Sequence, residues 1–72
     1  MSYTKKDVKS IANILRISKG VDKALQYCST KVKDYERMIA KTPDDFDGMN
    51  EKESHQIMIE FYLAVSLVLQ NN

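Results

Sequence analysis

The segment KTPDDFDGMNEKESH, residues 41–55, holds the residues whose types and spacing come closest to a metal site. Carboxylates at alternate positions followed by a glycine are typical of the start of an EF-hand calcium loop. With Gly48 at loop position 6, Asp45 falls at position 3, where a ligand belongs. Position 1 is then Pro43 and position 12 is Ser54, so the first carboxylate and the bidentate glutamate are missing. We expect no metal here.

The same segment is better explained as the turn between two helices, with residues that cap a helix start. Asn50 can cap a helix, and Glu53, three residues later, can complete a capping box. Gly48 can end a short turn before that cap. The pattern therefore predicts an acidic turn over residues 42–50, within which Phe46 has no structural role of its own.

Cys28 is the only cysteine and His55 the only histidine in this chain, and both residue types can bind metals or take part in catalysis. A structural zinc site needs about four Cys or His ligands, and these two do not suffice. Cys28 has no basic partner at a recognisable spacing, so we interpret it as a small buried apolar residue. No paired acid and base, phosphate-binding glycine loop or nucleophile elbow is present in the sequence. We expect no catalytic residues, no cofactor and no enzymatic activity.

The stretch VKSIANILRISKGVDKAL, residues 8–25, resembles a helix-turn-helix DNA-binding motif in its Ile-Ala pair, its turn serine and its spaced aliphatic residues. It departs from that pattern in three ways. Arg16 replaces the turn glycine, and Val21 and Leu25 come one residue early, which rotates the second helix by about 100°. The second helix is also long, about twenty residues, and few residues precede the motif, so the usual supporting helix must come from elsewhere. The resemblance implies that Lys19 and Lys23 flank a DNA groove. The alternative is a plain helical hairpin.

Charge is distributed unevenly along the chain. Residues 1–41 contain ten Lys or Arg and four acids, a net charge of +6, whereas residues 42–72 contain one Lys and six acids, a net charge of −5. Halves of opposite sign attract each other within a fold or across a dimer, and each can attract a charged partner. The candidate contacts to nucleic acid or to an acidic partner are the basic residues Lys5, Lys9, Arg16, Lys19, Lys23, Lys33, Arg37 and Lys41.

Apolar periodicity predicts three helices in one domain covering residues 1–72, at about 5–18, 21–41 and 51–70. Thr4 and Asp7 have the spacing of a capping box, and Gly20 suits the break after the first helix. Because the link at Gly20 is short, we expect the first two helices to be antiparallel neighbours.

The third predicted helix is apolar on nearly every side. Besides its main apolar face it carries a second stripe at four-residue spacing: Ile59, Leu63 and Leu67. Its longest apolar run has thirteen residues and includes Glu60, whereas a membrane span needs roughly 20. We expect no membrane insertion. The polar N-terminus lacks the features of a signal peptide, which favours a cytoplasmic location.

Together these patterns predict an all-α, small three-helix bundle: a helical hairpin plus a long apolar C-terminal helix. A second copy of the chain is the simplest cover for the extra stripe, so we expect a homodimer. The function that follows is a non-enzymatic protein–protein interaction module, a regulator or inhibitor acting by binding a partner protein. The alternative is a helix-turn-helix-like DNA-binding regulator that uses the basic N-terminal half. The expected partner or dimer interface comprises Ile59, Leu63, Leu67 and Phe46.

Overall fold

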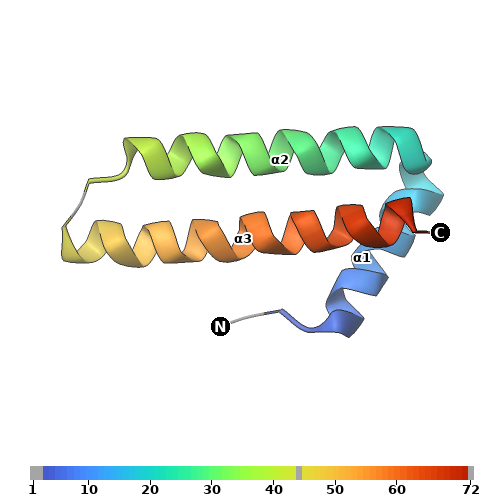
Figure 1. The fold of residues 1–72 in the computed structure, drawn as a ribbon, viewed down its shortest axis with the longest axis horizontal. Coiled ribbons are helices and arrows are strands. Elements are labelled where there is room, and N and C mark those ends of the chain that lie inside the picture. The colour runs from blue at the N-terminus through green and yellow to red at the C-terminus, as the bar shows by residue number, and fades with distance from the viewer. Residues whose placement is uncertain (1–2, 44, 72) are drawn as a thin grey trace.

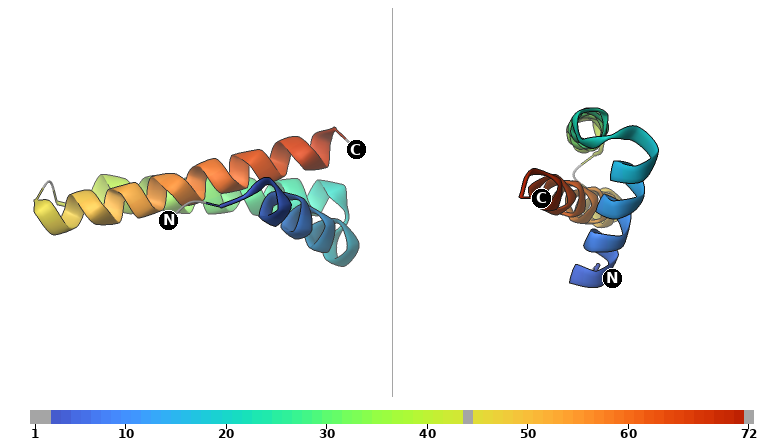
Figure 2. Two further views of the ribbon diagram at one scale, coloured as in Figure 1. Left: turned by 90° about the horizontal axis from the view of Figure 1, so that it is seen from below. Right: turned by 90° about the vertical axis from the view of Figure 1, so that its right-hand side faces the viewer.

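The chain folds into three helices. The computed structural model describes residues 3–43 and 45–71, apart from the side chains of Phe46 and Asp47. The helices are α1 (Lys5–Lys19), α2 (Val21–Lys41) and α3 (Phe46–Gln70). α2 and α3 lie side by side and run antiparallel, and α1 crosses the C-terminal part of α3 at a steep angle (Figures 1 and 2). The expected all-α three-helix bundle is confirmed.

The start of α1 is the predicted capping box. The Asp7 backbone N–H donates to Thr4 Oγ1 at 3.2 Å, and the Thr4 backbone N–H donates to Asp7 Oδ2 at 3.1 Å. Both bonds satisfy backbone donors that a helix start leaves without an intrahelical partner.

Gly20 alone separates α1 from α2. Its N–H donates to the Arg16 carbonyl at 2.9 Å, and its own carbonyl accepts from the Ala24 N–H at 2.9 Å. Its backbone has φ +81° and ψ +161°, a combination that is essentially restricted to glycine. This glycine therefore ends one helix and begins the next without an intervening loop.

The antiparallel helix pair is not the one expected. The short link at Gly20 predicts that the first two helices pack side by side, but the antiparallel neighbours are α2 and α3 (Figure 1). A helical hairpin needs a loop of about 2–5 residues to carry the chain back along its own path. One residue is too short for that reversal, so α1 turns away and packs across the pair.

The expected acidic turn over residues 42–50 is wrong at its C-terminal end, because α3 already begins at Phe46. The N-cap is Asp45, and the predicted cap, Asn50, lies inside the helix. Gly48 is in the first turn of α3, where a Cβ atom would overlap the Pro43 carbonyl. Glycine thus allows the chain to fold back tightly onto the helix start.

The core lies where all three helices meet. Its buried members come from α1 (Val8, Ala12, Leu15), from α2 (Ala24, Cys28) and from α3 (Val65, Leu69). The smallest of these side chains, two alanines and a cysteine, are completely buried, which lets the helices approach closely. α1 packs near the end of the α2–α3 hairpin that holds the C-terminus of α3, away from the connection between α2 and α3 (Figure 1). The core is therefore concentrated near the C-terminus of α3.

Candidate interaction surface on α3

One side of α3 is covered by α2 through a series of ring contacts. Tyr62 lies between two tyrosines of α2, with ring centroids 6.1 Å from Tyr27 and 6.2 Å from Tyr35. Tyr35 in turn lies 5.7 Å from the His55 ring. The Ser66 hydroxyl donates a hydrogen bond of 3.0 Å to the Tyr62 carbonyl and lies close enough to the Cys28 thiol to influence its pKa. The half-buried His55 thus lies at the edge of a helix interface. Sequence pattern alone did not reveal this polar aromatic seam.

Burial controls the protonation of the seam. It is the main reason that the pKa of Tyr62 rises to about 12, with the charge and hydrogen bond of Tyr27 adding to the effect. Burial also raises the pKa of the Cys28 thiol, against a smaller lowering by the nearby Ser66 hydroxyl. Both groups are therefore kept in their neutral forms. A buried neutral thiol is a poor nucleophile.

Ile59 belongs to the covered side of α3, so its assignment to an uncovered stripe is wrong. Its side chain is only 6% exposed. A spacing of four residues advances 400° around a helix, so each step along the stripe drifts by about 40°. From Leu67 back to Ile59 the drift reaches about 80°, which brings Ile59 into the face that carries Tyr62.

Leu63 and Leu67 form a ridge on the outside of α3 and are 50% and 60% exposed. We call these two residues the leucine ridge. A groove runs along each side of it. The groove toward α2 is lined by Leu25, Val32, Lys33 and Leu63 among others. The groove toward α1 is almost entirely apolar and is lined by Tyr3, Lys5, Val8, Lys9, Ala64, Leu67 and Val68. The side chain of Phe46, the fourth expected interface residue, lies outside the described part of the structure.

Three of the basic residues that we expected to contact nucleic acid or an acidic partner line the space between α1 and α3. Lys5 and Lys9 border the apolar groove beside Leu67, and Arg16 lies farther along, next to Val68. Arg16 Nε and Nη2 are buried and have no hydrogen-bond partner among the described residues. Within that part of the chain, neither lysine takes part in an ion pair. Positive charge therefore borders one side of the leucine ridge.

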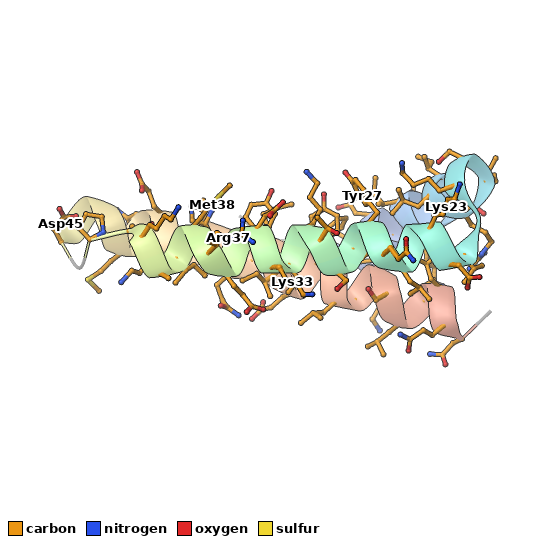
Figure 3. All side chains as sticks on the ribbon, turned by 90° about the horizontal axis from the view of Figure 1, so that it is seen from above. Lys23, Tyr27, Lys33, Arg37, Met38 and Asp45 are labelled. Atoms are coloured by element: carbon orange, nitrogen blue, oxygen red, sulfur yellow. The ribbon has the colours of Figure 1, made fainter. Side chains whose placement is uncertain are left out.

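Four of the other predicted basic residues are distributed over α2. Lys23, Lys33, Arg37 and Lys41 lie along it, and Figure 3 looks onto the helix that carries them. Arg37 Nη1 is 3.9 Å from Asp34 Oδ1 in an exposed ion pair, an arrangement that contributes little to stability.

Lys19 was expected to flank a DNA groove, but its Nζ lies 5.2 Å from the centroid of the Tyr27 ring. Lys31 Nζ lies 5.5 Å from the same centroid.

The corner between α1 and α2 differs from the packing that a helix-turn-helix motif implies. Ile17, the aliphatic residue of the motif's turn, is 79% exposed, and Val21 is exposed as well. Ile14, which periodicity assigns to the buried arc of the first helix, is also exposed. Apolar surface is therefore exposed near this corner, at Ile14 and Ile17 on α1 and at Val21 at the start of α2. The pattern alone could not identify it, because burial there depends on the angle at which α1 packs.

Within residues 3–43 and 45–71, no group of three or more His, Cys, Asp or Glu side chains could hold a metal ion. In the same part of the chain, no helix is both long enough and apolar enough to cross a bilayer. Comparison with protein-family profiles, with curated proteins and with solved structures found no match to this chain.

Proposed function

We propose that this chain is a small non-enzymatic interaction module, a regulator or inhibitor that acts in the cytoplasm by binding another protein through the leucine ridge. The observation that carries the proposal is the exposure of Leu63 and Leu67 on neighbouring turns of α3. Contiguous exposed apolar surface with polar residues at its border is typical of protein-binding sites.

The ridge offers enough free energy to act as the centre of an interface. Full burial of a leucine side chain contributes roughly 1.5–3 kcal/mol, and about half of that is still available at each of the two positions. The grooves on both sides of the ridge add apolar surface that a partner can fill.

The chemistry of the seam supports a non-catalytic role. Its two groups with shifted pKa values, Tyr62 and Cys28, are both held in the neutral form and lie between packed helices. Catalytic groups are usually shifted toward a pKa near the working pH and border a cleft. Here the shifts follow from helix packing.

The test compares a double variant of the ridge with a control variant outside it. Leu63→Gln/Leu67→Gln removes the apolar ridge with little change in helix propensity, and Ile17→Gln removes an exposed apolar residue near the corner between α1 and α2. Tagged wild-type and variant proteins are used for affinity capture from the source cells, followed by mass spectrometry. We expect a protein that is captured by the wild type and by Ile17→Gln but lost with the ridge variant. Loss with Ile17→Gln and retention with the ridge variant would contradict the proposal.

A second candidate function is DNA binding, which is favoured by Lys23, Lys33, Arg37 and Lys41 along α2. Binding through these residues would be dominated by phosphate contacts and would weaken steeply with salt. A filter-binding titration on mixed duplex DNA at two salt concentrations tests this. No retention of DNA at low salt would contradict the DNA hypothesis and leave the protein-binding proposal unaffected.

A further inference from the structure

We propose that the leucine ridge is covered by a second copy of the same chain, with the two α3 helices antiparallel and Glu60 of each copy beside Lys9 of the other. This inference rests on the proposed function, because it names the protein that covers the same two leucines. It is carried by the shape of the surface, by the order of charges along α3 and by the lysines of α1 that border the groove.

The shape of the surface is self-complementary. Leu63 and Leu67 project between two grooves, and the apolar groove toward α1 begins directly beside Leu67. Two helices pack when the ridge of one enters the groove of the other. In a two-fold dimer a ridge next to a groove satisfies both copies at once, since the ridge of each lies in the groove of the other.

The ridge is also accessible along its length. Six exposed residues of α3 follow one another at spacings of three and four, the seam of a helix that packs against another helix: Glu53, Gln56, Glu60, Leu63, Leu67 and Gln70. This stripe lies opposite the faces that contact α1 and α2, which carry Phe61 and Tyr62, respectively. Neither helix of the same chain blocks the approach of a partner helix.

The order of charges selects the antiparallel arrangement. Along this stripe the acids Glu53 and Glu60 precede the leucines. A parallel pair would place Glu60 against Glu60 of the second copy, and like charges at close range repel. An antiparallel pair centred between Leu63 and Leu67 overlaps the leucines of both copies and carries Glu60 toward the C-terminal end of the other α3.

The cations of α1 lie at that end. Lys9 borders the groove beside Leu67 and Val68, and Lys5 borders the same groove. Neither lysine has an ion pair within the described residues of its own chain, and the same is true of Glu60. The antiparallel dimer therefore brings charges of opposite sign together twice, once on each side of the two-fold axis.

The overlap is short, so we expect a weak dimer. It covers the C-terminal part of α3, from Glu60 onward, together with the edge of α1, and we expect it to bury less than the roughly 800 Å² per partner of a standard interface. Dimerisation should therefore depend on protein concentration. Because charge pairs form part of the contact, it should also weaken as salt is added.

The experiment is sedimentation velocity over a series of concentrations with wild type, Lys9→Glu, Glu60→Lys and an equimolar mixture of the two variants. In each single variant both charge pairs become repulsive, and we expect the dissociation constant to rise about fivefold to tenfold. In the mixed dimer, the two substituted positions face each other with opposite charges on one side of the axis. On the other side the original Lys9 and Glu60 face each other. The mixture should therefore regain association close to that of the wild type.

Helical content measured by circular dichroism verifies that each variant is folded, and Leu63→Gln/Leu67→Gln should abolish association. A wild type that is monomeric at every concentration overturns the inference. So does an association that the ridge variant leaves unchanged, or a mixture that associates no better than either variant alone. If the chain is monomeric but a partner is still captured only with an intact ridge, the dimer is wrong and the proposed function stands. If a charge-rescued dimer forms and no partner is captured, the dimer stands without a further partner.

Discussion

The Asp45 carboxylate accepts a hydrogen bond of 2.6 Å from the Gly48 backbone N–H. This bond marks the first turn of α3 and explains why the helix begins earlier than its pattern indicates. It satisfies a backbone donor that would otherwise have no intrahelical partner, and it uses an aspartate that resembles a calcium ligand in the sequence. The acidic segment thus acts as a helix start.

Replacing the cap should reveal where α3 begins. We expect Asp45→Ala to lower the free energy of unfolding by about 0.5–2 kcal/mol, because the Gly48 N–H loses its partner. The matched variant is Asn50→Ala, at an exposed position inside α3, where alanine is the better helix former. Urea denaturation measures both. A larger loss with Asn50→Ala than with Asp45→Ala would contradict a helix start at Phe46.

The link between α1 and α2 should depend on glycine. Gly20→Ala meets no steric obstacle, since nothing lies within 4 Å of an added Cβ, but the backbone has φ +81°. We expect a loss of about 1–3 kcal/mol in the free energy of unfolding from backbone strain alone. Ser18→Ala, at an exposed position two residues earlier, is the control and should change stability by no more than about 0.5 kcal/mol. Equal effects of the two variants would mean that the link is not strained.

The aromatic seam should make stability depend on pH in the alkaline range. Well below pH 10 the Tyr62 phenol is neutral in both the folded and the unfolded chain, so its contribution to the free energy of unfolding does not change with pH. As pH rises from 10 toward 12, the unfolded chain loses the phenol proton while the folded chain keeps it, so the free energy of unfolding falls. The Tyr62→Phe variant lacks the ionisable phenol of Tyr62 but keeps every other ionisable side chain. The same denaturation series is measured on it. We expect a shallower decline for this variant, and identical slopes would contradict the raised pKa.

Cys28 should be protected from thiol reagents in the folded protein. Its side chain is completely buried and its pKa is raised, so both access and thiolate formation are unfavourable. We expect slow labelling by a chromogenic disulfide reagent in buffer and fast labelling in denaturant. A Cys28→Ala/Ser29→Cys variant moves the thiol to the adjacent exposed position and should react quickly when folded. Equally fast labelling of wild-type Cys28 would show that the seam opens readily.

Agreement between pattern and structure depends on how far apart the interacting residues lie in the sequence. The α1 capping box at Thr4 and Asp7 and the bounds of α2 follow from residues close together, and the structure agrees with both. The start of α3 could not be predicted in the same way. Both Asp45 and Asn50 are good caps, and the choice between them depends on how closely the Pro43 carbonyl approaches Gly48.

The sequence by itself determined the helical class, the number of helices and the excess of apolar residues in the last helix. These are consequences of local propensity and of periodicity along one chain. Only the tertiary structure decided which apolar residues remain uncovered. Ile59 and Leu67 belong to the same stripe in the pattern, yet one is buried and the other exposed, because the stripe drifts around α3 while α2 stays on one side.

The angle of α1 likewise exposes Ile14 and Ile17 and brings Lys5 and Lys9 to the groove beside the leucine ridge. Those placements depend on contacts between helices, which no single helical pattern contains.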